Sequence, residues 1–409
     1  MTGQRNQETI EIKGHLGPIK ALQSPLTLTM APLTVFIGPQ GTGKSLVSQL
    51  LYFFRDAQYL ISTYSHQEGP EKSVRKVLDG IRSGESTERA FASFVMNRQV
   101  DITYTQQSQE GSRSRSISLY ESNRTIRATG DFSKDIKSWL TALVEDPSVS
   151  SELEAEALFI PAERSFFSRL INSNPAGLGD RSLPITMREF SRFLIQAANT
   201  HQGWQEQNQE KPYEVNEIDA LIAHELRGRA IFSKRGPYAR RWQWMPEEGR
   251  RPIEIEMASS GQMETWPMVS IAQAVFAWEP SQRPLFLHIE EPETHLHPSA
   301  QIAITKLLAY LCNKGFRLVI TTHSMFVLYM LNNLVLANKN LPHKEFDDVP
   351  DVSQWLPREQ LSAYLFAEGT VTSIRDSITG ELDESRLSSV LGELEVQYNH
   401  IQSYGVLWS

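Results

Sequence analysis

The sequence predicts an α/β protein built on a mostly parallel sheet with flanking helices. Its C-terminal half alternates between strand-like and helix-like segments, the pattern of a parallel sheet with helical crossovers. A further apolar strand over 33–37 leads through a glycine-rich turn into a helix. With 40% hydrophobic and 9% aromatic residues, the 409-residue chain can bury a large core. The alternating segments are helix 262–277, strand 284–289, helix 298–311, strand 316–321 and helix 324–333.

Four regions follow from the patterns along the chain. The first contains short strands and a helix over 44–64, and the third contains the regular alternation. Between them, helical stretches mix with strand-like pieces, which predicts an insertion. The last region predicts a β-hairpin over 362–375 and a terminal helix over 384–400. The regions span residues 1–64, 65–255, 256–340 and 341–409.

Composition indicates in which cellular compartment the protein works. A single cysteine, Cys312, leaves no disulfide framework. No apolar run approaches the roughly 18 residues that span a bilayer, and the first residues lack the apolar core of a signal peptide. We therefore expect a cytoplasmic protein without a membrane partner. The formal charge of −8 comes from the acidic stretch 344–409, since the rest of the chain is balanced.

A phosphate-binding loop gives the strongest functional signal. The segment matches GxxxxGK[ST] and lies between an apolar strand and a helix, the context that distinguishes a P-loop from an ordinary glycine-rich turn. Its backbone N–H groups and the helix N-terminus would face ATP phosphates. Lys44 would reach the β- and γ-phosphates, and Ser45 would bind Mg²⁺. The loop is Gly38-Pro39-Gln40-Gly41-Thr42-Gly43-Lys44-Ser45.

Acidic and imidazole side chains follow two later strands. Glu290 and Glu291 directly follow the apolar strand 284–289. Glu290 would bind Mg²⁺, and Glu291 would act as general base for attack on the γ-phosphate. A helix N-terminus that favours acidic residues is the alternative. His323 lies just after the strand 316–321, where it would contact the γ-phosphate. The alternative is a histidine with a structural role only.

A second candidate phosphate nest lies upstream of the acidic strand. Ser259, Ser260 and Gly261 begin a helix, so their N–H groups are available to an anion, and Gln262 follows them. Taken together, the motifs GPQGTGKS, ASSGQ, LFLHIEEPETHLHP and TTHS resemble the ABC-type ATPases of the SMC, RecF and OLD group.

That resemblance implies an ABC-type P-loop ATPase head with an antiparallel β lobe and helical insertions. In this group two heads sandwich two ATP molecules, so Ser259, Gly261 and Gln262 would act on the nucleotide held by another copy. The implied unit is a homodimer or higher homo-oligomer. Two positions depart from the commoner pattern, because Ser260 replaces a glycine and Glu290 replaces an aspartate. Arg164, in a PAER-type loop, would lie near the nucleotide or pack beneath the sheet.

The chain lacks the additional parts of its better-known relatives. Neither a Toprim-type set of metal-binding acids nor long coiled-coil heptads appear. Heads of this kind resemble the ATPase subunits of two-gene anti-phage systems such as PARIS and Septu. The resemblance implies an oligomeric sensor and scaffold that controls a separate effector, a nuclease.

An alternative function is a RecF-like repair ATPase that binds DNA. It depends on the basic stretch Arg227–Arg251, where Tyr238, Trp242 and Trp244 alternate with arginines. Such a mixture is typical of surfaces that contact phosphates and stack bases. A solvent-exposed hairpin is the competing interpretation of the same stretch.

Overall fold

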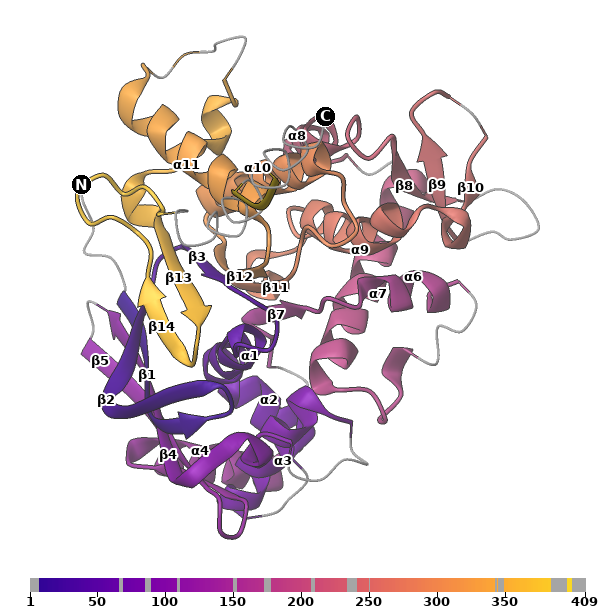
Figure 1. Cartoon of the computed structure of the whole chain (residues 1–409). Coiled ribbons are helices and arrows are strands. Elements are labelled where there is room, and N and C mark those ends of the chain that lie inside the picture. Colours follow the sequence, from indigo (N-terminus) through magenta and orange to yellow (C-terminus); the bar gives the residue numbers. More distant parts are fainter. Residues whose placement is uncertain are drawn as a thin grey trace, which may run out of the picture.

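A computed structural model of the chain shows two large sheets with helices between and around them (Figure 1). The structure describes residues 7–65, 69–84, 90–108, 111–149, 153–172, 178–206, 210–233, 241–249, 251–342, 344, 349–383 and 396–398.

The central sheet has six strands in the order β14-β13-β3-β12-β11-β7. Every neighbouring pair is parallel except β13 and β14, which form the predicted antiparallel hairpin. The core strands are buried on both faces, which explains their uninterrupted apolar sequences. Their bounds are β3 Leu33–Ile37, β7 Ala157–Ile160, β11 Phe286–Glu290, β12 Arg317–Thr322, β13 Leu361–Ala367 and β14 Thr370–Ser373.

Helix α1 (Lys44–Arg55) lies against one face of this sheet, and α10 (Pro298–Asn313) and α11 (Met325–Asn340) lie on the other (Figure 1). The sequence predicted one helix over 44–64, but the structure breaks it at Asp56 and continues as α2 (Ala57–Tyr64). The buried Asp56 accepts a hydrogen bond from the backbone N–H of Glu156, which ties the break to the chain entering β7.

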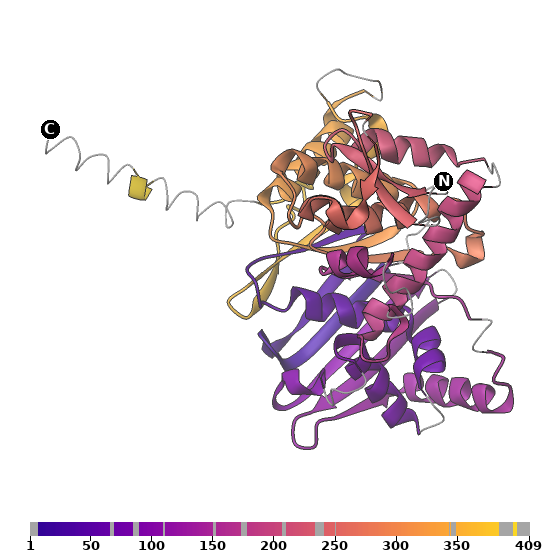
Figure 2. The same cartoon turned by 90° about the vertical axis from the view of Figure 1, so that its right-hand side faces the viewer.

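The second large sheet is antiparallel, with the order β2-β1-β4-β5-β6. It lies beside the central sheet and packs on helices from the same half of the molecule (Figure 2). The predicted insertion over 65–255 contributes strands to both large sheets, since β4 pairs with β1 and β7 pairs with β11. The elements are β1 Gln7–Leu16, β2 Ile19–Met30, α3 Pro70–Arg82, β4 Val95–Ser108, β5 Gly111–Tyr120, β6 Thr125–Thr129 and α4 Asp131–Glu145.

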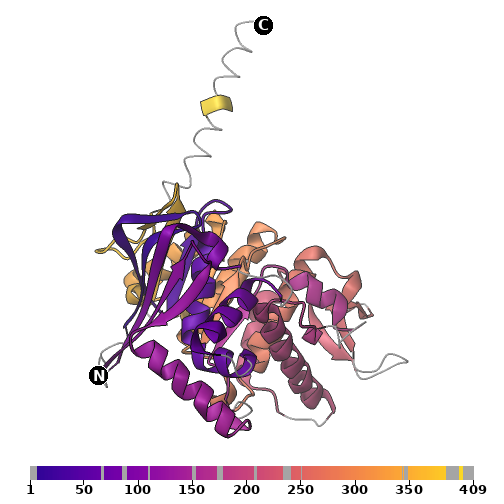
Figure 3. The ribbon, with the colours of Figure 1, turned by 90° about the horizontal axis from the view of Figure 1, so that it is seen from below.

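A helical layer with a small sheet, β10-β9-β8, completes the molecule. Its longest helix, α7, lies next to the helices that follow the phosphate-binding loop (Figure 3). The elements are α6 Arg164–Leu170, α7 Ile185–Glu206, α8 Tyr213–Ile222, β8 Gly228–Ser233, β9 Arg241–Pro246, β10 Ile253–Glu254 and α9 Ser260–Ala274.

Two sequence expectations concern a terminal helix and membrane-spanning helices. The predicted terminal helix over 384–400 lies outside the described residues except for 396–398. Among the described helices, none combines the length and the apolar composition that crossing a lipid bilayer requires.

Candidate functional site

The phosphate-binding loop connects β3 to α1 as its sequence predicts. Gly38 has φ +141°, and a Cβ atom there would lie 2.1 Å from the carbonyl oxygen of Phe366 on β13, so only glycine fits. Gly43 has φ +100° and is the N-cap of α1. Pro39, Gln40 and Gly41 are exposed at the tip of the loop. The positive end of α1 therefore faces a loop that approaches solvent.

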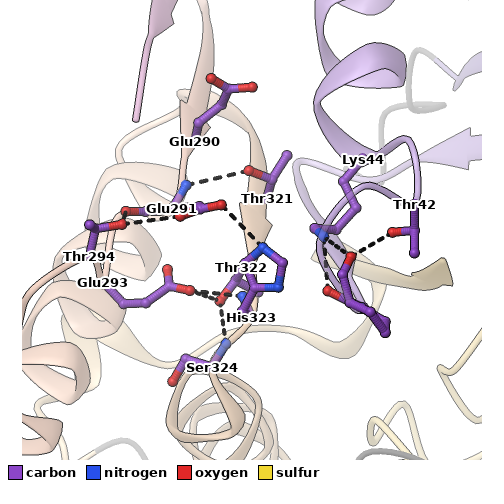
Figure 4. Close-up of polar contacts among 12 residues, drawn as sticks. Thr42, Lys44, Glu290, Glu291, Glu293, Thr294, Thr321, Thr322, His323 and Ser324 are labelled. Carbon is purple, nitrogen blue, oxygen red and sulfur yellow. Dashed lines mark hydrogen bonds and ion pairs between the residues drawn. The ribbon is translucent and has the colours of Figure 1, made fainter. Parts of the chain in front are cut away.

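Lys44 is held against its own loop. The ammonium group donates hydrogen bonds to the carbonyl oxygens of Gly38 (2.8 Å) and Pro39 (2.7 Å), and Thr42 Oγ1 donates to Pro39 as well (2.8 Å). Burial lowers the pKa of Lys44 to about 8, and the carboxylates of Glu291 and Glu293 oppose this shift. A cation is thus fixed between the loop and the acidic strand end (Figure 4).

Glu290 and Ser45 come together although 245 positions separate them in sequence. Glu290 is 7% exposed, and burial raises its pKa to about 7, while a hydrogen bond with the Ser45 side chain lowers it. Glu290 Oε1 is buried and has no hydrogen-bond partner among the described residues. A cation would supply the missing partner and stabilise the charged carboxylate.

This pair fits Mg²⁺, which typically binds one or two protein oxygens together with substrate phosphates and water. In the part of the chain that the structure describes, no group of three or more His, Cys, Asp or Glu side chains could hold a metal by itself. The predicted metal site is therefore Ser45 and Glu290 beside the phosphate-binding loop.

Glu291 and His323 form a polar pair at the ends of β11 and β12. Glu291 Oε1 lies 3.1 Å from His323 Nε2, and both side chains are partly exposed, at 34% and 28%. The φ of Glu291 is +42°, a left-handed conformation that is costly for a side chain of this type. The N–H of Glu291 donates to the Thr321 carbonyl (2.9 Å), and Thr294 Oγ1 donates to the Glu291 carbonyl (2.9 Å). The turn thus directs a carboxylate toward the site (Figure 4).

Glu293 is a site residue to which the sequence interpretation gave no role. One carboxylate oxygen accepts hydrogen bonds from Thr322 Oγ1 (2.5 Å) and from the N–H of His323 (2.9 Å). This residue fixes the end of β12 and therefore the position of the His323 ring. Its spacing within the Glu290-Glu291-Pro-Glu293 run was the only available signal.

Arg164 is fully buried and lies directly behind the acidic end of β11, so it packs inside the protein and also adjoins the candidate site. It donates to the carbonyl oxygens of Glu290 (2.6 Å) and Glu291 (2.9 Å), and also to those of Glu264 and Pro161 (both 2.9 Å). The guanidinium therefore joins the acidic strand end to helix α9, and it holds the site from behind.

The predicted second nest forms the N-terminus of α9. Ser259 is exposed and is the N-cap, and Gln262 completes a capping box with it. Gln262 also donates to the Leu226 carbonyl (2.8 Å), so its side chain is engaged within its own chain. Gly261 packs against the turn after β11, where a Cβ atom would lie 2.7 Å from the His295 carbonyl oxygen.

The two tryptophans of the basic stretch that the structure describes are core residues and are not available to stack bases. Strands β8 and β9 pair as an antiparallel hairpin, but Trp242 and Trp244 are 0% and 2% exposed. The Trp242 ring packs against Trp266, with ring centroids 4.7 Å apart. The stacking interpretation is wrong for these two residues because the alternation of the strand directs them into the core. Tyr238 lies outside the described residues.

The family model of the AAA ATPase domain matches residues 91–328, more than half of the chain. The match includes both glutamates at the end of β11 and His323, and it begins after the phosphate-binding loop. No curated protein matches the chain.

Head domains of SMC proteins are among the similar solved structures. The SMC head domain from Thermotoga maritima has a TM-score of 0.41 and 12% identity, over 91% of this chain and 100% of that one. The Smc head domain with an extended coiled coil, bound to the C-terminal domain of ScpA derived from Pyrococcus furiosus, has the same TM-score of 0.41 and 12% identity, over 95% and 99%. An SmcHead bound to the C-winged helix domain of ScpA has a TM-score of 0.44 and 13% identity, over 90% and 98%.

Three parts of the site lie at one edge of the mostly parallel sheet: the P-loop between β3 and α1, the acidic end of β11, and the histidine after β12. The family match covers the acidic end of β11 and the histidine. The chain belongs to the AAA ATPase domain family.

Proposed function

We propose that the protein binds ATP with Mg²⁺, hydrolyses it, and works as an oligomeric scaffold that controls a separate effector. One observation carries the enzymatic part: Lys44, the Ser45–Glu290 pair and the Glu291–His323 pair meet at the same sheet edge. A phosphate cradle, a buried metal-binding carboxylate and a partly exposed base are the components that phosphoryl transfer to water requires.

Each residue has a distinct task in hydrolysis. The loop N–H groups and Lys44 bind the phosphates, and Lys44 must release its hydrogen bonds to Gly38 and Pro39 to do so. When bound, Mg²⁺ would neutralise phosphate charge as it develops. Glu291 orients the attacking water and takes up its proton, while His323 holds the carboxylate in place at 3.1 Å.

The proposed oligomer uses the exposed start of α9. Ser259 is exposed there, so a second copy can present its nucleotide to this helix terminus. Because the side chain of Gln262 is engaged within its own chain, we assign the contact across the interface to Ser259 and the backbone N–H groups of the first turn.

The proposed effector is a nuclease encoded beside this chain in an anti-phage system. Support comes from the motif set, whose resemblance to the ATPase subunits of two-gene anti-phage systems implies a separate effector. Purification of the native complex from its own operon tests this step. A nuclease that elutes with the chain in fixed ratio is expected, and a chain that elutes without one contradicts the proposal.

The DNA-binding alternative is not favoured by the described part of the basic stretch. Arg229 lies 3.3 Å from Asp219, and Arg241 lies 3.7 Å from Glu254, so both guanidinium groups already have acidic neighbours. With Trp242 and Trp244 in the core, the described residues of this stretch present no exposed aromatic ring on which bases could stack.

Replacing Lys44 with alanine tests the enzymatic proposal. We expect Mg²⁺-dependent phosphate release to fall by about 100-fold or more, because the cation that binds the β- and γ-phosphates is lost. Lys137→Ala, which changes an exposed lysine on α4, is the matched control and should hydrolyse ATP like the wild type. Unchanged hydrolysis by Lys44→Ala would remove the phosphate-binding loop from the mechanism.

A further inference from the structure

A cavity of about 430 Å³ lies between α2, the chain before α7 and the first half of α7. It is within the size range of small-molecule sites. Its lining mixes apolar and polar surface and carries three arginines and one glutamate. The residues that matter are Thr63, Tyr64, Arg181, Arg188, Glu189 and Arg192.

The single carboxylate of the cavity is already satisfied. Glu189 is 2% exposed and accepts hydrogen bonds from Tyr59 Oη (2.9 Å), from Tyr64 Oη and from Arg192 Nε (2.8 Å). Its negative charge is therefore balanced by Arg192. Arg181 and Arg188 have no acidic partner within the described ranges, so the cavity keeps a net positive charge.

Two arginine donors in this cavity lack acceptors. Arg188 Nε and Arg192 Nη2 are buried and make no hydrogen bond to any described residue. Unsatisfied buried donors are costly, and those on a charged group are the costliest. The Arg188 guanidinium also lies 4.8 Å from the centre of the Tyr64 ring, a cation–π contact that holds it at the cavity wall. The side chains that carry these donors line the cavity, and a turn of each guanidinium group toward it would let oxygen atoms of a bound anion satisfy the donors.

We propose that this cavity binds a small phosphate-bearing molecule, distinct from the ATP at the phosphate-binding loop. Planar guanidinium groups match phosphate oxygens in two-point hydrogen bonds, and several of them around one cavity favour a polyphosphate over a monovalent anion. The concave shape and limited volume favour a small molecule over a nucleic-acid strand.

The position of the cavity links it to both nucleotide-binding segments. Helix α2 continues from α1, which begins at the phosphate-binding loop, with only Asp56 between them. Helix α7 packs on α9, whose N-cap is Ser259, and His201 Nε2 on α7 lies 3.2 Å from the Ser270 carbonyl oxygen on α9. A ligand that joins α2 to α7 therefore acts on the helices that start at the two ends of the proposed ATP sandwich. This regulatory step rests on the proposed function, whereas the binding step does not.

Calorimetric titration with tripolyphosphate tests the binding step. Because the phosphate-binding loop is itself a polyphosphate site, the titration uses Lys44→Ala protein, in which only the second site should remain. In that background, replacing Arg181 and Arg188 together with glutamine should weaken binding by about tenfold or more. Arg113→Gln, at an exposed arginine on β5, is the matched control and should leave binding unchanged.

Three results would overturn the proposal. Lys44→Ala protein that does not bind tripolyphosphate has no second site, and this outcome leaves the ATPase proposal intact. Equal affinity with and without the two arginines, in variants whose thermal unfolding matches the control, places the anion elsewhere. Binding of a short single-stranded oligonucleotide through these arginines, without binding of tripolyphosphate, would make the cavity part of a nucleic-acid surface.

Hydrolysis assays test the regulatory step. Tripolyphosphate competes at the phosphate-binding loop equally in the wild type and in the Arg181→Gln/Arg188→Gln variant, so any difference between their responses reports on the cavity. We expect equal basal turnover and a response to tripolyphosphate that differs by about twofold or more. Identical responses would contradict coupling between the cavity and the ATP site.

Discussion

Glu291 shows how a single residue conformation prepares the site. Its φ of +42° costs about 1 kcal/mol or more, and contacts with Thr321 and Thr294 hold it in this conformation. The result is a carboxylate that faces His323 at 3.1 Å while remaining partly exposed. Its neighbour Glu290 is buried, so adjacent carboxylates serve different tasks, one toward the metal and one toward water.

Replacing Glu291 tests whether this carboxylate, and not Glu290, accepts the proton of the attacking water. Glu291→Gln keeps the size of the side chain but removes the proton acceptor, so turnover should fall by about 100-fold or more while ATP affinity stays close to that of the wild type. Glu145→Gln, at an exposed position on α4, is the matched control. Phosphate release and equilibrium ATP binding are the two measurements. Normal turnover of Glu291→Gln would assign the base to another residue.

The elements of the two large sheets are joined by a buried ionic network around Glu8 on β1. Glu8 accepts hydrogen bonds from Arg55 on α1 (2.8 Å) and Tyr104 on β4 (2.6 Å), and Arg317 on β12 lies 3.2 Å from it. Arg55 Nη1 in turn lies 3.1 Å from His288 Nε2 on β11. The helix after the phosphate-binding loop is thereby fixed to the acidic strand and to the antiparallel sheet.

Glu8→Gln should destabilise the protein in a pH-dependent way. Although burial alone would raise it, the pKa of Glu8 is lowered to about 2 by Arg55, Arg317 and Tyr104, and the shift from 4.5 corresponds to about 3 kcal/mol. Because the folded pKa is below the unfolded value, this stabilisation is present above about pH 4.5 and is lost as the pH falls toward about 2.

The measurement is urea unfolding of wild type and variant between about pH 7 and about pH 3. The difference in unfolding free energy should be largest near neutral pH and should narrow as the solution is acidified. Glu11→Gln, at an exposed position on the same strand, should show no such difference. A gap between Glu8→Gln and wild type that is constant with pH would show that the ion pair does not contribute through its charge.

At the scale of the whole molecule, the proposed sandwich requires two copies to build one site. Lys44 is the first residue of α1 and Ser259 is the N-cap of α9. The described hydrogen bonds of the Ser259 hydroxyl and N–H are with Gln262 in its own turn. One copy therefore offers a phosphate cradle and the other a helix N-terminus. Loss of either part should inactivate a homo-oligomer.

Mixing two inactive variants tests this arrangement. In a pair of Lys44→Ala and Ser259→Arg subunits, one composite site carries both defects and the other carries none, so part of the hydrolysis should return. Each parent alone is the control, and circular dichroism shows whether loss of the Ser259 cap, worth about 1 kcal/mol, has unfolded the protein. Activity that stays at the level of the parents would argue against action across an interface.

The sequence by itself determined the parts that depend on local pattern. The GxxxxGK[ST] match needs a strand before it and a helix after it, so its residues predict both the chemistry and the turn at Gly38 and Gly43. The alternation over 262–333 likewise predicted α9, β11, α10, β12 and α11, because buried parallel strands are apolar throughout. The predicted hairpin near the C-terminus was confirmed for the same local reason.

Only the tertiary structure decided which distant residues meet. Strand alternation puts Trp242 and Trp244 on one face of the hairpin, but whether that face is buried depends on where Trp266 of α9 lies. The positions of Arg164 beneath Glu290 and of the cavity between α2 and α7 likewise depend on packing between segments more than 100 residues apart, because burial and charge pairing are properties of neighbours in space.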